Sequence, residues 1–71
     1  MTKEEAIKKL EEGFRLTHYY FSNYEWMILY NNHSYQFEDD TIIDINRFWK
    51  LRQNGGWNIN WEIYKMYNNE I

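Results

Sequence analysis

The chain has 71 residues, a formal net charge of −3 and no cysteine, and 21% of its residues are aromatic. This length corresponds to one domain with a small core. The absence of cysteine excludes disulfides and thiolate zinc sites. The acidic balance argues against binding of long nucleic acids, and no run of about 18 apolar residues is present that would span a membrane.

The aromatic content bears on how so small a domain is stabilised. Four Trp and seven Tyr exceed what a core of this size encloses, so some rings are expected on the surface. There, Trp and Tyr mark subunit contacts and ligand-stacking sites. Small chains without disulfides or metals are commonly stabilised by oligomerisation. We therefore expect a homo-oligomer.

The first predicted element is a helix that begins at Thr2 and ends at Gly13. Thr2 and Glu5 have the spacing of a capping box. The apolar residues that follow recur at helical spacing: Ala6, Ile7 and Leu10. Gly13 is expected at the position just after the helix, where glycine is favoured.

Several segments are predicted to be strands because β-branched and aromatic residues dominate them: 14–21, 25–30, 33–37, 41–43 and 61–64. Asn31-Asn32 is expected to form a two-residue hairpin turn, since asparagine tolerates positive φ. In the strand that follows, Tyr35 and Phe37 are expected to point inward. Trp26 and Trp61 alternate with aliphatic residues, so we predict that both belong to the core.

A second helix is predicted between the fourth and last strands. Asp44 is the expected N-cap of this helix, and one helix face holds Ile45, Phe48, Trp49 and Arg52. The glycines at 55–56 end it, and residues 57–60 are expected to be a loop. The order predicts one α+β domain over residues 1–71, with an antiparallel sheet of four to five strands. Residues 66–71 are expected to be a loosely held tail.

The sequence contains few features of an enzyme. It has no cysteine nucleophile and no phosphate-binding loop, and its serines lack a nucleophile-elbow context. The acidic run at 38–40 lacks the spacing of a calcium loop and is expected to be solvated. His18 and His33 are 15 positions apart, with no second pair to complete a metal site. We therefore predict a protein that binds rather than catalyses, without a metal or cofactor.

Two short stretches combine cations with aromatic rings, at residues 15–21 and 47–52. Rings that stack on bases, interleaved with cations that meet phosphates, suit nucleotide recognition. An ordinary structural role is the alternative: Arg15 as a solvated strand residue, Trp49 as a core residue and His18 as a partly buried structural histidine. The asparagines near Gly55 and Gly56 offer amide hydrogen bonds to a small polar ligand, or form a common turn-rich connection.

Several segments resemble those of small phage-encoded proteins: Glu4–Gly13, Leu16–Phe21, Asn23–Met27, Phe48–Arg52 and Asn60–Tyr64. Their layout is similar to that of sponge proteins which defeat nucleotide-signalled immunity. These are the Thoeris anti-defence proteins, which hold cyclic ADP-ribose isomers, and the anti-CBASS sponges, which hold cyclic dinucleotides. The resemblance implies a homo-oligomer, plausibly a tetramer, with ligand pockets at subunit interfaces in the cytoplasm of the infected bacterium.

Under this reading the protein sequesters a cyclic nucleotide signal without degrading it. Tyr20 and Trp57 are the expected stacking residues, and Arg15 and Arg52 are expected to meet phosphates. His18 and Asn58 are the candidates for further polar contacts. The alternative is a phage protein that inhibits a host protein by direct binding, for example an anti-CRISPR, with the surplus aromatic residues as its contact surface.

Overall fold

The structure is a computed structural model that describes residues 1–65, and the predicted tail at 66–71 lies outside the described residues. Its elements are α1 (Lys3–Glu11), β1 (Leu16–His18), β2 (Met27–Asn31), β3 (Ser34–Phe37), β4 (Ile42–Asp44), α2 (Ile45–Lys50), the 3-10 helix η1 (Gly55–Asn58) and β5 (Trp61–Ile63). The predicted α+β class is confirmed, with a five-stranded antiparallel sheet and two α-helices.

Helix α1 begins at the predicted capping box. The Glu5 amide donates to the Thr2 hydroxyl oxygen at 3.2 Å, and the Thr2 amide donates to the Glu5 carboxylate at 2.8 Å. These bonds satisfy two of the amides that the first turn of a helix leaves unpaired. The helix buries Ala6 and Leu10, two of the three residues of the predicted apolar stripe.

Helix α1 ends in a Schellman motif in which Gly13 is the C′ residue, as predicted. Gly13 has a φ of 97°, which a residue with a side chain rarely adopts. Its amide donates to the Leu10 carbonyl at 3.0 Å, and the Phe14 amide donates to the Lys9 carbonyl at 3.1 Å. This pair of bonds pairs the last carbonyls of the helix and turns the chain toward β1.

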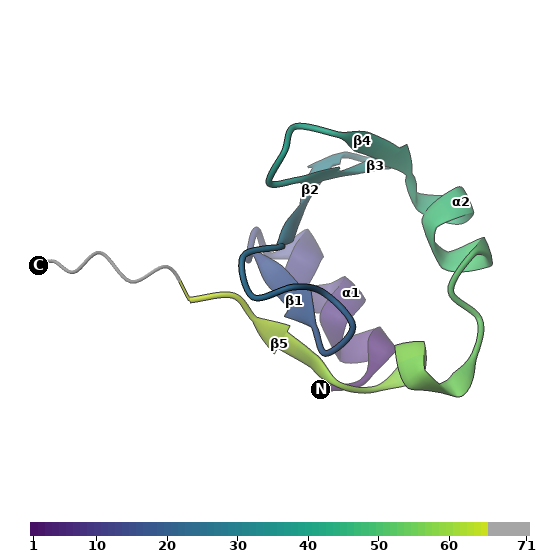
Figure 1. Ribbon diagram of the computed structural model, residues 1–71. Coiled ribbons are helices and arrows are strands. Elements are labelled where there is room, and N and C mark those ends of the chain that lie inside the picture. Colours follow the sequence, from purple (N-terminus) through teal and green to yellow (C-terminus); the bar gives the residue numbers. More distant parts are fainter. Residues whose placement is uncertain (66–71) are drawn as a thin grey trace, which may run out of the picture.

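The sheet has the strand order β4-β3-β2-β1-β5. The first four strands follow one another as neighbours, and the fifth returns to pair with the first (Figure 1). The β1–β5 pair extends over three positions, whereas β1 and β2 share the single register pair of Leu16 with Met27. The sheet therefore consists of two parts, joined at one short seam. Helix α2 and η1 connect the outer ends of these parts (Figure 1).

Strand β1 is shorter than the predicted segment 14–21, because the chain turns after His18. The Phe21 amide donates to the His18 carbonyl at 2.9 Å, and the Tyr20 amide donates to the His18 ring at 3.0 Å. Both amides are thereby used within a local turn instead of a strand ladder. The prediction that Tyr19, Tyr20 and Phe21 continue the strand is wrong.

Other boundaries also differ from the prediction. The hairpin turn is at Asn32-His33 and not at Asn31-Asn32, because a register shift between Leu29 and Asn31 lengthens β2. Helix α2 ends at Lys50, so Arg52 lies beyond it, although its amide still donates to the Trp49 carbonyl at 3.0 Å. Part of the predicted loop at 57–60 belongs to η1.

The core lies between the sheet, α1 and α2. Its buried apolar residues are Ala6, Leu10, Leu16, Met27, Tyr35, Phe48, Trp49 and Trp61. Tyr35 faces inward and Phe37 packs against this core, as predicted. Trp61 is fully buried, but Trp26 is only half-buried. The guanidinium carbon of Arg15 lies 4.6 Å from the centroid of the Trp26 ring. The prediction of a core position is therefore confirmed for Trp61 alone.

Candidate functional site

His18 is almost completely buried, with 3% of its surface exposed. Both of its ring nitrogens form hydrogen bonds within the chain. Its Nδ1 accepts from the Tyr20 amide at 3.0 Å, so the ring proton lies on Nε2. Nε2 faces the carbonyl oxygens of Gly56 at 2.9 Å and Ile59 at 2.8 Å. The histidine therefore ties the end of β1 to η1, and its partners occupy the atoms with which it would contact a ligand.

Three aromatic rings surround this imidazole. The indole of Trp57 lies 4.3 Å away, centroid to centroid, at 31°. The phenol of Tyr20 lies 5.0 Å away, and Trp61 meets the imidazole edge-on at 4.6 Å. Tyr20 and Trp57 also meet each other edge to face at 4.9 Å. We call His18, Tyr20 and Trp57, with Arg52 beside them, the ring cluster.

Arg52 is held in the ring cluster by aromatic faces and not by a carboxylate. Its guanidinium carbon lies 3.9 Å from the ring centroid of Phe48 and 5.1 Å from that of Trp57. Nη1 donates to the Phe48 carbonyl at 3.2 Å, while the buried Nε has no hydrogen-bond partner within residues 1–65. Burial lowers the pKa of this guanidinium, which nevertheless stays charged.

Tyr20 closes the ring cluster on its solvent side. A β-carbon built at Gly56 would overlap its phenol oxygen, so the ring lies directly against the η1 backbone. Asn54 is the N-cap of η1, because its side-chain oxygen accepts a hydrogen bond from the Gly56 amide at 3.0 Å. About half of Tyr20 remains exposed, at 54%, so part of the phenol is available to a ligand or to another protein.

The structure does not bring all of the predicted site residues together. His18, Tyr20, Arg52 and Trp57 meet in the ring cluster. Arg15 lies at the other end of β1, where its carbonyl accepts from the Tyr64 amide at 2.8 Å. Asn58 is the exposed last residue of η1, and its side chain makes no hydrogen bond to the described part of the chain.

A surface hollow of about 350 Å³ borders the ring cluster at His18. Its lining comes from β1, the turn that follows it, β5 and the residue before β5: Thr17, His18, Tyr19, Phe21, Ser22, Asn23, Asn60 and Glu62. Sequence reasoning selected only His18 from this group. Thr17 and Glu62 are neighbours because β1 and β5 pair in that register, and a register between distant segments has no local signal in the sequence.

Among residues 1–65, no group of three or more His, Cys, Asp or Glu side chains is arranged to hold a metal ion. Within the same part of the chain, no helix has the length and apolar character needed to cross a membrane. Comparisons of the chain with protein-family models, with curated proteins and with solved structures gave no match in any of the three.

Proposed function

We propose that this protein is a phage immune-evasion protein that binds a cyclic nucleotide second messenger and sequesters it intact. The ligand would be a cyclic dinucleotide, such as cyclic GMP–AMP, or a cyclic ADP-ribose isomer. The observation that supports this most is the position of Arg52. Its charged guanidinium is fixed by two aromatic rings, one of which, Trp57, also contacts the half-exposed Tyr20, and it forms no ion pair within residues 1–65.

The ring cluster has the chemistry that such a ligand requires. A guanidinium with unused donors can form charge-assisted hydrogen bonds to a phosphate. The exposed part of Tyr20 offers a surface on which a base can stack. Because Arg52 is already held by Phe48 and Trp57, little side-chain entropy is lost when an anion binds. Sequestration needs tight binding and a high protein concentration, but no catalytic group.

The proposed assembly is a homo-oligomer, with a tetramer as the expected form, that acts in the cytoplasm of the infected bacterium. Tyr19 and Tyr24 lie on the turn between β1 and β2, and both are well exposed. Exposed tyrosines are typical of contact surfaces between proteins. A second copy placed on this turn would cover the side of the ring cluster that is open to solvent, and would complete a pocket for a cyclic ligand.

The first test is a thermal-shift screen of the purified protein against cyclic dinucleotides, cyclic trinucleotides and cyclic ADP-ribose isomers, with their linear forms as controls. A ligand at 100 times its dissociation constant stabilises the native state by about 2.7 kcal/mol. We expect a large shift with one cyclic nucleotide, which mass spectrometry then recovers unchanged after heating. No shift with any of these ligands would refute the proposal.

Matched variants test the ring cluster itself. Arg52→Ala is expected to weaken binding at least about tenfold, because it removes the anion contact. Arg47→Ala, at an exposed position of α2, is its control. Tyr20→Ala is compared with Tyr30→Ala, since the two side chains are 54% and 53% exposed. Equal affinities within either pair would show that the ligand binds elsewhere.

The second candidate is an inhibitor that binds a host protein directly, such as an anti-CRISPR. The exposed tyrosines around the β1–β2 turn favour it, because tyrosine is enriched among residues that dominate binding energies. A pull-down from host lysate that yields a stoichiometric protein partner, combined with no nucleotide-dependent thermal shift, would support this function. Tyr19→Ala and Tyr24→Ala would then weaken capture, and Tyr30→Ala would not.

A further inference from the structure

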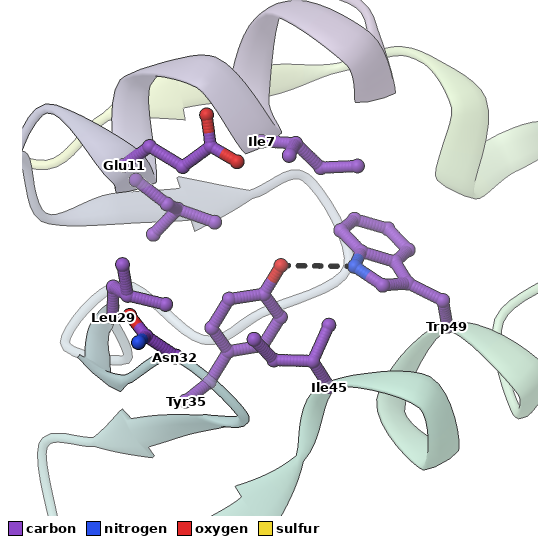
Figure 2. A pocket seen from close by; sticks show the side chains of 8 residues that line it. Ile7, Glu11, Leu29, Asn32, Tyr35, Ile45 and Trp49 are labelled. Atoms are coloured by element: carbon purple, nitrogen blue, oxygen red, sulfur yellow. Dashed lines mark hydrogen bonds between the residues drawn. The ribbon is translucent and has the colours of Figure 1, made fainter.

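A second hollow shares no lining residue with the ring cluster. It encloses about 310 Å³ between α1, the β2–β3 hairpin and α2 (Figure 2). Its lining residues are Ile7, Leu10, Glu11, Leu29, Asn32, Tyr35, Ile45 and Trp49. This volume is near the lower end of the range for small-molecule pockets, so a single ring system would fill it.

The interior of this cavity is apolar except at a few points. The hydroxyl of Tyr35 points to its centre, and its oxygen accepts the Trp49 indole N–H at 2.9 Å (Figure 2). That bond uses an oxygen lone pair and leaves the hydroxyl proton without an acceptor within residues 1–65. Because Tyr35 is only 2% exposed, little solvent reaches this hydroxyl to accept the proton. A ligand with a hydrogen-bond acceptor satisfies it.

On the α1 side, the cavity presents a hydrogen-bond acceptor instead of a donor. The Glu11 carboxylate lines the cavity and forms no hydrogen bond or ion pair with the described part of the chain. Lys8, one turn earlier, lies outside ion-pair distance, and the one ion pair of this region joins Lys9 to Glu12. Glu11 is also the last residue of α1, where the helix dipole adds negative potential. This wall attracts an N–H donor and repels a phosphate.

We infer that the cavity binds a flat heteroaromatic ring in which an amino group lies beside a ring-nitrogen acceptor, as in adenine or cytosine. The amino group would donate to Glu11 and the ring nitrogen would accept from Tyr35. The aliphatic walls and the Trp49 indole would enclose the faces of the ring. This site goes beyond the proposed function: it selects an uncharged or cationic ring, whereas the ring cluster selects an anion.

The test uses free adenine as the probe and the Trp49 indole N–H resonance as the readout, because this group lies in the cavity wall. Hypoxanthine is the control ligand, since it has the same size and carries a carbonyl oxygen in place of the amino group. We expect a saturable shift of this resonance with adenine, and at least about tenfold weaker binding of hypoxanthine. The indole resonance of Trp57 is expected to stay in place.

Glu11→Gln is expected to weaken adenine binding at least about fivefold, because an uncharged amide is a weaker acceptor. Glu12→Gln removes the same charge at the next position, outside the cavity lining, and is expected to leave the affinity within about twofold. Three results would overturn the inference: no saturable shift up to about 10 mM adenine, equal affinity for hypoxanthine, or equal effects of the two variants. A Trp49 shift that follows protein dilution instead would assign the cavity to a second copy of the chain.

The adenine test of the cavity and the cyclic-nucleotide test of the ring cluster can fail independently. Free adenine lacks the phosphate that Arg52 would bind, and a cyclic nucleotide can raise the thermal midpoint without shifting the Trp49 resonance. The Arg52→Ala protein provides the cross-check, because it is expected to bind adenine as the unmodified protein does.

Discussion

The phenol of Tyr20 lies against Gly56 so closely that no β-carbon fits between them. Gly56 in turn presents its carbonyl to Nε2 of His18 at 2.9 Å, while Nδ1 of the same ring accepts from the Tyr20 amide. The turn after β1 and the 3-10 helix before β5 are therefore fixed to each other through both backbone and side chain. This connection determines where the exposed edge of Tyr20 lies.

Gly56→Ala is expected to displace the phenol of Tyr20. Because this ring is about half exposed, it can swing toward solvent, so the cost in folding free energy should be on the order of 1 kcal/mol. Gly55→Ala is the control, since a β-carbon there meets nothing within 4 Å. Urea denaturation of both proteins measures the difference, and equal midpoints would contradict the close approach of Tyr20.

His18→Leu is expected to destabilise the protein by about 2–4 kcal/mol, because it leaves two carbonyl oxygens and one amide unpaired in a buried place. The lost partners belong to Gly56, Ile59 and Tyr20. His33 is exposed, so His33→Leu should change the free energy of unfolding by no more than about 0.5 kcal/mol. Chemical denaturation provides the comparison. Similar losses in the two proteins would mean that His18 does not have this structural role.

Tyr35→Phe is expected to cost about 1–3 kcal/mol, because it leaves the Trp49 indole N–H without its acceptor inside the core. Burial also raises the pKa of the Tyr35 phenol above its ordinary value of 10.0. Above about pH 10 the unfolded chain has lost this proton and the folded one retains it, so stability falls as pH rises. The unmodified protein should show this fall in a series of denaturation curves. In Tyr35→Phe the fall should be smaller, and an unchanged alkaline fall would mean that Tyr35 does not contribute to it.

Thr2→Ala is expected to lower stability by about 1 kcal/mol, a typical effect of removing an N-cap. Hydrogen bonds from the backbone and side chain of Thr2 lower the pKa of the Glu5 carboxyl. The associated stability is present above the ordinary pKa of 4.5 and is lost as the pH falls below it. Glu5→Gln should reduce this acid dependence, and Glu4→Gln, which removes a charge without a cap bond, should not. Thermal melts between about pH 3 and pH 7 measure both. Equal acid dependence in the two glutamine variants would contradict this account.

The sequence predicted the elements whose determinants are local. Thr2 and Glu5 are three positions apart, and Gly13 ends the helix through its own backbone conformation, so both ends of α1 were recognisable. Asp44 likewise accepts from the Arg47 amide at 3.0 Å, as expected of an N-cap. The alternation at Tyr35 and Phe37 identified the inward face of β3, because side chains in a strand point alternately to its two sides.

Features that depend on one particular side-chain contact, or on distant segments of the chain, could not be predicted in this way. The aromatic run at 19–21 has the composition of a strand, but His18 captures the Tyr20 amide and the chain turns instead. Arg52 fits the helical spacing, yet its side chain packs across Phe48 after the helix has ended. Glu11 and Tyr35 line one cavity only because α1 packs opposite the β2–β3 hairpin, whereas the sequence indicated no more than that Tyr35 points inward.

The single register pair between β1 and β2 makes Leu16 and Met27 the narrowest join in the sheet. We expect a sheet with such a join to flex there between two leaves, β2–β3–β4 and β1–β5, because few backbone bonds fix the angle between them. Helix α1, which ends at Glu11, packs on β1 and β5 and also contacts β2, whereas Tyr35 belongs to β3 in the other leaf. A molecule held between Glu11 and Tyr35 would act as a wedge between the leaves and set their angle. We therefore expect the width of the cavity and the curvature of the sheet to change together.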